Sequence, residues 1–242
     1  MFLTVKKWTL LYIMMLLAVF GGFALILRQG SGMQAVSASA EATDPPPVLV
    51  IDPGHGGEDG GATGEDGTVE AGINLSLSLR MEEIAAFLGV ETVMTRREDI
   101  SLHDSGLSTF RARKTSDLVN RTAIANSVPE GVLISIHQNK LPGYPTVHGA
   151  QVFYNAVPGS EMLAAAVQEE LNIHINDGSA KATKAADSGI YLLQHTTCPG
   201  ILVECGFLSN PEETDLLKSG EYQTKLAVTI LAAALSHLSA PQ

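Results

Sequence analysis

The chain has 242 residues, of which 26 are acidic and 15 are basic, so its formal net charge is -11. Its hydrophobic content of 45% is sufficient for a folded core and excludes a chain that is disordered throughout. Two cysteines are too few to staple a domain of this size, and the acidic balance excludes nucleic-acid binding through a basic face.

Residues 1–28 are typical of a membrane anchor or a signal segment. Residues 8–27 carry no charge, and a helix of this length spans roughly 30 Å, the thickness of the hydrocarbon core. Two lysines precede this run and an arginine follows it, which favours a cytoplasmic N-terminus and an external domain. An uncleaved anchor is our preferred prediction, and cleavage near Ala40 is the alternative. Both predict that the protein acts outside the cytoplasm.

Residues 29–47 are rich in Ser, Ala and Gly and end in consecutive prolines, which predicts a linker. Residues 48–242 then form the predicted catalytic domain. Its short apolar runs, such as VLVID at 48–52, are typical of buried strands in a parallel sheet. Strands are expected at 48–52, 90–95, 132–136, 149–154, 189–193 and 201–204.

Helices are predicted between these strands from apolar spacing and from end signals. Apolar residues recur at steps of three and four over 70–88, and Gly89 is the expected stop signal. Ser116 is the expected N-cap of a helix reaching Asn126, and residues 101–115 are expected to form a mobile surface loop. Further helices are expected at 160–173, from Asn210, and up to about His237. The alternation predicts an α/β fold, with a single twisted, largely parallel sheet flanked by helices.

Polar residues follow three of the predicted strands at the points where these strands end. His55, His137 and Glu204 occupy these positions, and Glu70 begins the helix that follows the first strand. Because the carboxyl ends of parallel strands share one edge of a sheet, these side chains can converge there. Two imidazoles and one carboxylate make a three-ligand zinc set, and a second carboxylate can accept a proton from the attacking water.

The spacing alone also allows separate structural roles for these residues. A histidine at a strand end can be an ordinary loop residue, and a glutamate at a helix start can simply favour the helix dipole. Glu204 lies between apolar runs, so we expect it to be half-buried, where an acid without a role is costly.

Four segments carry a resemblance to a known family. Residues 49–57 (LVIDPGHGG), 70–75 (EAGINL), 134–139 (ISIHQN) and 202–211 (LVECGFLSNP) resemble, in order, the signature blocks of the zinc-dependent N-acetylmuramoyl-L-alanine amidases of the amidase-3 family. The resemblance covers roughly residues 48–238. It implies that one Zn²⁺ is bound by His55, Glu70 and His137, and that Glu204 is the catalytic acid/base. The implied reaction is hydrolysis of the amide between N-acetylmuramic acid and L-alanine in peptidoglycan.

A finer resemblance is to the germination-specific, spore-cortex subgroup of this family. It is carried by the single anchored domain, by residues 113–118 with Arg121, and by residues 188–192. This resemblance implies action on spore cortex as a step toward muramic δ-lactam. The implied partners are peptidoglycan, a peptidoglycan deacetylase, and the membrane through the N-terminal helix, with no nucleic acid.

Three alternatives stay open beside the amidase. They are a zinc peptidase acting within the stem peptide, a non-catalytic wall-binding module, and an anchored adaptor that recruits a deacetylase. Cys198 and Cys205 are predicted to be free thiols, because seven extended residues separate them by roughly 20 Å. Cys205 follows the catalytic glutamate directly and could compete for the zinc.

Other polar residues near these segments have two candidate roles each. Asn74 and Asn139 are expected to hydrogen-bond the ligands or the substrate. Arg96 and Arg121 are expected to form salt bridges, with binding of peptide carboxylates as the alternative.

Overall fold

The computed structural model describes residues 47–239, so the predicted anchor and nearly all of the predicted linker lie outside this part of the chain. Within residues 47–239, no helix is both long enough and apolar enough to cross a bilayer. The elements in chain order are β1 (Val48–Pro53), α2 (Glu70–Phe87), β2 (Thr92–Met94), α3 (Phe110–Asn126), β3 (Gly131–Asn139), β4 (Gln151–Tyr154), α4 (Ser160–His174), β5 (Lys184–Ala185), α5 (Tyr191–His195), β6 (Gly200–Phe207), α6 (Pro211–Lys218) and α7 (Gly220–Ser239).

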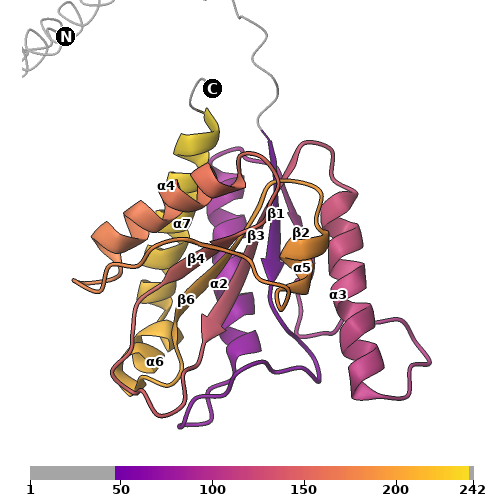
Figure 1. Ribbon diagram of the computed structural model, residues 1–242, viewed down its shortest axis with the longest axis horizontal. Helices are drawn as coiled ribbons and strands as arrows, with labels where there is room; N and C mark the ends of the chain where they lie inside the picture. Colours follow the sequence, from indigo (N-terminus) through magenta and orange to yellow (C-terminus); the bar gives the residue numbers. More distant parts are fainter. Residues whose placement is uncertain (1–46, 240–242) are drawn as a thin grey trace, which may run out of the picture. The chain divides into compact units, whose positions relative to one another are not determined.

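The strands form a six-stranded sheet in the order β2-β1-β3-β6-β4-β5 (Figure 1). The first four strands run parallel to one another, whereas β4 is antiparallel to β6. Helices α2, α4 and α7 cover one face, and α3 and α5 cover the other. The predicted α/β fold with a largely parallel sheet is therefore confirmed.

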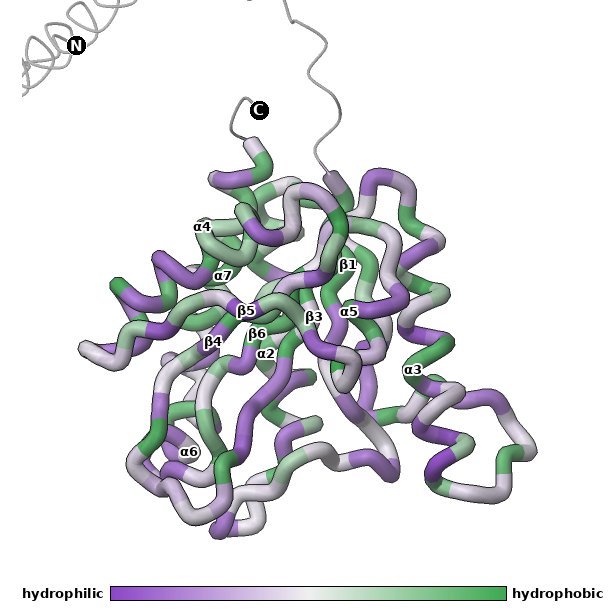
Figure 2. The backbone as a smooth tube through the Cα atoms, in the orientation of Figure 1, coloured by the Kyte–Doolittle hydropathy of each residue, from purple (hydrophilic) through white to green (hydrophobic). Residues whose placement is uncertain are grey.

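The strand pattern divides the apolar residues between two cores, and Figure 2 shows hydrophobic segments gathered around the central strands. In β3, Ile134 and Ile136 pack in the core beneath α2, α4 and α7, whereas Leu133 packs in the core beneath α3 and α5. Successive side chains of a strand point to opposite faces. Ser135 and His137 therefore lie on the α3 side of the sheet.

The predicted boundaries of several elements are confirmed. Helix α2 begins at Glu70, and Gly89 follows its last turn with a left-handed φ of 73°. Helix α6 begins after Asn210, whose side chain accepts a hydrogen bond from the Glu213 amide, as a capping residue does.

The prediction for the start of α3 is wrong. The helix begins six residues before Ser116, and Thr109 is the capping residue, since its side chain accepts a hydrogen bond from the Ala112 amide. Ser116 instead hydrogen-bonds Asp104 from within the helix. Residues 110–115 are therefore helical, and not part of a loop. Their basic side chains pair with acids of the loop after β1, which residue-by-residue propensity does not reveal.

The strand predicted at 189–193 is also wrong, because the short helix α5 lies there. Leu192 and Leu193 are both buried in the core beneath α3 and α5. A strand would have sent these consecutive side chains to opposite faces, whereas a helical turn buries both. The two-residue edge strand β5 was not predicted, and both of its residues are exposed.

A buried ion pair ties β1 to α3. The carboxylate of Asp52 accepts a hydrogen bond from Arg121 at 2.8 Å, and the Arg121 guanidinium also donates to Asp117 at 2.7 Å. The hydroxyls of Thr95 and Ser135 each donate to Asp52 at 2.7 Å. Because Asp52 and Arg121 are almost completely buried, the position of α3 depends on this fully hydrogen-bonded network.

We expect the Asp52→Asn substitution to lower the free energy of unfolding at pH 7 by about 3 kcal/mol, because it leaves the buried Arg121 charge uncompensated. Burial raises the pKa of Asp52, but Arg121 and the two hydroxyls outweigh it and lower the pKa to about 2. The carboxylate therefore stabilises the fold above its unfolded-state pKa of about 3.9, and this contribution of about 2 kcal/mol is lost as the pH falls through 2.

Urea unfolding between pH 7 and pH 2 measures both effects. The difference in stability between the wild type and Asp52→Asn should narrow toward pH 2. Glu91→Gln, which changes an exposed carboxylate, is the control and should parallel the wild type. A constant difference at every pH would show that Asp52 does not contribute through its charge.

Thr109→Ala should lower the free energy of unfolding by about 1 kcal/mol, because it removes the hydrogen bond at the start of α3. The expected change in Tm is a decrease of roughly 2–4 °C, measured by thermal unfolding. Thr115→Ala is the matched control at an exposed position inside the helix, and it should be neutral or slightly stabilising. An equal loss in both variants would contradict the capping role.

Candidate metal centre and active site

The structure brings the three predicted ligand residues together. His55 lies in the loop after β1, Glu70 is the first residue of α2, and His137 lies near the end of β3. One ligand atom from each residue lies within 4.8 Å of the others. These side chains come from segments far apart in the sequence, and together they could hold a metal ion.

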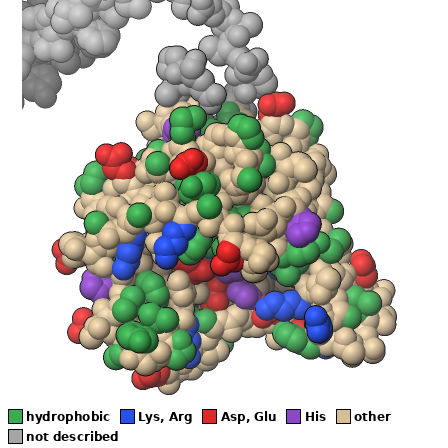
Figure 3. Space-filling view, in the orientation of Figure 1, with side chains coloured by type: hydrophobic (Ala, Val, Ile, Leu, Met, Phe, Trp, Pro, Cys, Tyr) green, Lys and Arg blue, Asp and Glu red, His purple; other side chains and the backbone are tan. Residues whose placement is uncertain are grey.

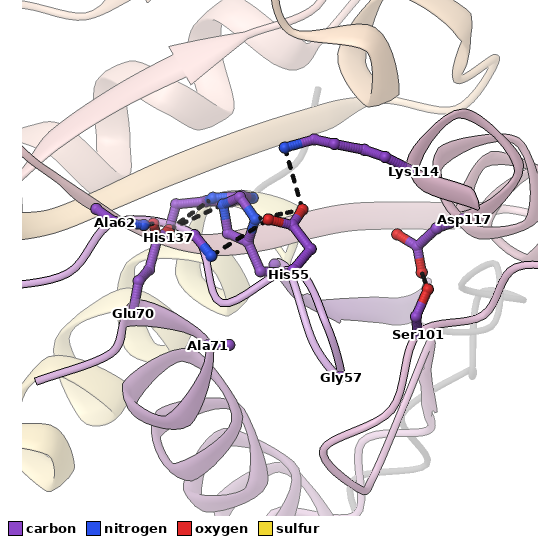
Figure 4. A network of polar contacts seen from close by, with 12 residues as sticks. His55, Gly57, Ala62, Glu70, Ala71, Ser101, Lys114, Asp117 and His137 are labelled. Atoms are coloured by element: carbon purple, nitrogen blue, oxygen red, sulfur yellow. Dashed lines mark hydrogen bonds and ion pairs between the residues drawn. The ribbon is translucent and has the colours of Figure 1, made fainter. Parts of the chain in front are cut away.

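Both imidazole rings face the Glu70 carboxylate (Figure 4). The Nε2 atom of His55 lies 3.4 Å from Oε1 of Glu70, and the Nδ1 atom of His137 lies 3.0 Å from the same oxygen. The two rings meet edge to face, with their centroids 4.9 Å apart. Two nitrogen donors and one oxygen donor thus converge on a single point, a set that suits a divalent transition metal.

The orientation of Glu70 is determined by backbone and side-chain donors. Its Oε2 atom accepts a hydrogen bond from the Ala62 amide at 2.7 Å, and its Oε1 atom accepts one from the Gln138 amide at 3.0 Å. The side-chain amide of Asn74 also donates to Oε1, as the sequence predicts. The side chain of Asn139 accepts instead from the Lys140 amide. Burial raises the pKa of Glu70, but the hydrogen bonds with His137 and His55 hold it well below its usual range.

The backbone at His55 has a left-handed φ of 62°, which is a strained conformation for a residue other than glycine. Arg121 donates to the His55 carbonyl at 2.6 Å, and Arg96 donates to the carbonyls of Pro53 and Gly54. Both guanidinium groups are buried, so they hold the loop after β1 rather than face the solvent. Salt bridging is confirmed for Arg121, whereas Arg96 mainly binds backbone carbonyls.

Gly54 allows this loop to pass close to the second histidine. A Cβ atom on Gly54 would overlap the imidazole ring of His137. The turn that follows is closed by backbone hydrogen bonds between Gly56 and Asp59. Gly54 is therefore required by the close packing at the site, and Gly56 and Gly57 adopt positive φ values of 135° and 61°, which favour glycine.

Sequence reasoning missed Asp59, which contacts His55 on the side opposite Glu70. Its Oδ2 atom lies 2.9 Å from the Nδ1 atom of His55 and 3.1 Å from the ammonium of Lys114. Burial lowers the pKa of His55, but its hydrogen bonds with Asp59 and Glu70 raise the pKa to about 9. Asp59 could have been suspected from the sequence, because metal-binding histidines commonly donate a hydrogen bond from their other ring nitrogen to a carboxylate.

Glu204 lies beside the ligand group but not within it. It is the register partner of His137 across β3 and β6, so both side chains lie on the same face of the sheet. It is half-buried, as predicted, and its Oε2 atom is enclosed without a hydrogen-bond partner among residues 47–239. Burial raises the pKa of Glu204 to about 7, with a further increase from Glu70 and opposition from the two histidines. This carboxyl can therefore gain or lose a proton near neutral pH.

Cys205 points away from the site. It is completely buried in the core beneath α2, α4 and α7, and burial raises the pKa of its thiol. It does not belong to the group of candidate ligands, so its location gives no support to competition for a metal. Cys198 and Cys205 are both free, as predicted.

The comparisons with known proteins place the chain in a family. The Amidase_3 family, described as N-acetylmuramoyl-L-alanine amidase, matches residues 49–236. The germination-specific N-acetylmuramoyl-L-alanine amidase of Bacillus subtilis is 34% identical over 192 residues, which cover 79% of this chain and 80% of the relative.

Two solved structures have the same fold. The CwlD amidase from Clostridioides difficile, in complex with the GerS lipoprotein, matches with a TM-score of 0.76 and 35% identity over 80% of this chain and 98% of that one. The AmiC2 amidase of Nostoc punctiforme matches with a TM-score of 0.63 and 30% identity over 82% of this chain and all of that one. The protein therefore belongs to the Amidase_3 family of N-acetylmuramoyl-L-alanine amidases, amide hydrolases that act on the cell wall.

Proposed function

We propose that the protein is a zinc-dependent amidase in which His55, Glu70 and His137 hold the ion and Glu204 is the catalytic acid/base. The observation that carries this proposal is the convergence of two imidazoles and a carboxylate beside an unpaired, half-buried Glu204. Two His and one Glu are a known ligand set of catalytic zinc sites, which keep an open position for water.

The charges around the site also suit a cation. Glu70 and Asp59 surround His55 and raise its pKa to about 9, so the carboxylates already favour a positive charge at this point. Asp59 accepts from Nδ1 of His55 and leaves Nε2 directed toward Glu70, which is the arrangement that a metal ligand needs.

When bound, zinc would polarise the scissile carbonyl and make a water molecule more acidic. Glu204 would accept a proton from the attacking water and return it to the leaving alanine nitrogen. Its raised pKa of about 7 suits both steps, because the carboxylate must be able to gain and lose a proton near the working pH. Asn74 and Asp59 would hold Glu70 and His55 in their orientations throughout.

The proposed substrate is the amide between N-acetylmuramic acid and L-alanine in spore-cortex peptidoglycan. The germination-specific relative from Bacillus subtilis and a sporulation-specific amidase from the same organism, 28% identical over 190 residues, support the cortex role. This cleavage would be one step toward the formation of muramic δ-lactam. A zinc peptidase or a non-catalytic wall-binding module is a weaker candidate, because the relatives are named as amidases and all four polar side chains are present.

The relatives support some of the predictions for binding partners and cellular location. Relatives that act on the cell wall support action outside the cytoplasm, and the anchor at residues 1–28 stays a prediction. The CwlD amidase was solved in complex with the GerS lipoprotein, so we propose a lipoprotein as a partner of this chain. The deacetylase stays a prediction from the sequence.

Digestion of purified cortex peptidoglycan should release intact stem peptides with new amino groups on L-alanine. Glu204→Gln should lower the rate of this release by at least about a hundredfold, because general acid/base catalysis contributes on that scale. Its zinc content and Tm should match those of the wild type, since Glu204 is not among the proposed ligands. Mass spectrometry of the products and metal analysis measure both expectations.

A chelator should also stop the reaction, and added zinc should restore it. Cleavage within the stem peptide would support the peptidase instead. Full activity of Glu204→Gln would exclude Glu204 from catalysis.

Zinc affinity should rise about tenfold for each pH unit between about pH 6 and pH 8. The His55 side chain, with a pKa of about 9, must release one proton before it binds the ion. Competition with a chromophoric chelator measures this slope on the metal-free protein. An affinity that does not change with pH would contradict the linked protonation.

His137→Ala should lower zinc affinity in the same assay. His174→Ala is the matched control, because His174 forms an exposed pair with Glu170 on α4. One zinc per chain in His137→Ala, at the affinity of the wild type, would remove His137 from the ligand set.

A further inference from the structure

Lys114 extends from α3 toward the candidate metal centre (Figure 4). Its ammonium lies 3.1 Å from Oδ2 of Asp59, and the same oxygen lies 2.9 Å from Nδ1 of His55. Its side chain is 42% exposed, whereas those of Asp59 and His55 are mostly buried. Lys114 therefore places a solvent-accessible positive charge two hydrogen-bond lengths from a candidate metal ligand.

The acidic side chains of the loop after β1 disfavour a substrate carboxylate at the edge of the site, away from the ion that His55, Glu70 and His137 would hold. Glu58 and Asp59 lie in the loop after β1, and Glu70 and Glu204 lie at the centre of the site. Figure 3 shows acidic and histidine side chains in a hollow, with lysine and arginine side chains gathered on either side. A cationic side chain beside this loop can offset the repulsion by pairing with the carboxylate.

The other cations near the loop are already engaged. Arg113 pairs with both carboxylate oxygens of Glu58. Arg121 is buried in its ion pairs with Asp52 and Asp117, and Arg96 is buried among backbone carbonyls. The ammonium of Lys140 donates a hydrogen bond to the carbonyl of Thr63, which lies between β1 and α2. Lys114 contacts a single oxygen of Asp59, whereas Arg113 engages both oxygens of Glu58, and a partly exposed ion pair through one oxygen is weak. Lys114 can therefore exchange Asp59 for a substrate carboxylate at little cost.

We propose that Lys114 binds a carboxylate of the stem peptide and so determines which stem peptides the enzyme prefers. The proposal rests on the proposed amidase function and adds a specificity contact to it. Each residue of an extended peptide spans about 3.5 Å, so a carboxylate on the residue after L-alanine lies on the order of 7 Å from the scissile amide. Where the residue after L-alanine is a D-glutamate linked through its side chain, its α-carboxylate is free unless it is amidated.

Two soluble muropeptides test the proposal, one with the free D-glutamate α-carboxylate and one with that group amidated. The wild type should hydrolyse the free acid with the higher kcat/KM. Lys114→Met should lower kcat/KM for the free acid about tenfold, because a charge-assisted hydrogen bond is lost, and should leave the amidated substrate unchanged. Lys114→Arg should retain the preference for the acid.

Lys140→Met is the matched control, and its substrate preference should equal that of the wild type. Zinc content and Tm, measured on every variant, show whether the metal site and the fold are intact. An equal decrease in kcat/KM for both muropeptides in Lys114→Met would mean that Lys114 acts only through Asp59, and would overturn the proposal. A loss of preference in Lys140→Met alone would also overturn it.

The two levels of inference fail in different ways. If the zinc-loaded wild type hydrolyses neither muropeptide, the proposed amidase function fails and the carboxylate contact fails with it. If the wild type hydrolyses both at equal rates, the amidase function stands and the role of Lys114 alone is wrong.

Discussion

The geometry of the site depends on one buried cation. Arg121 of α3 donates to Asp52, to the Pro53 carbonyl and to the His55 carbonyl. These bonds connect the end of β1 to a helix on one face of the sheet and hold His55 in a left-handed conformation. Such a conformation persists only where its surroundings determine it. Arg121 therefore links the loop that carries His55 to the end of β1 and to α3.

Glu70 and Glu204 have different environments, and these favour different chemical roles. Two backbone amides and the Asn74 amide orient Glu70. Burial raises its pKa, but hydrogen bonds and charge interactions with His137 and His55 outweigh burial and lower the pKa, so its charged form is favoured. Glu204 is enclosed without a partner in the described structure, so burial favours its neutral form. Pairs of acids whose pKa values are pushed apart commonly divide into a fixed charge and a proton carrier. The same residue type thus serves as a candidate ligand at one position and as a candidate acid/base at the other.

Strand register explains why the predicted side chains meet. In β1, β3 and β6, the parallel pairing places Asp52 beside Ser135, and His137 beside Glu204. Apolar runs followed by polar residues revealed three of these strands, since a buried strand needs an unbroken apolar stretch. Local sequence patterns gave wrong secondary-structure predictions where contacts with distant segments determine the structure. The early start of α3 and the helical turn of α5 both depend on partners elsewhere in the chain, namely the loop after β1 and the second core.

The sequence by itself determined the α/β class and the order of the central elements, and it predicted the four polar residues of the candidate site, because apolar periodicity and motif order are local properties. The tertiary structure alone decided that Asp59 orients His55, that Cys205 points into the core and that Lys114 borders the site. Each of these depends on which face a side chain occupies and on which distant segment packs against it. Those facts arise from the register of the sheet and the docking of α3, which no single stretch of the chain contains.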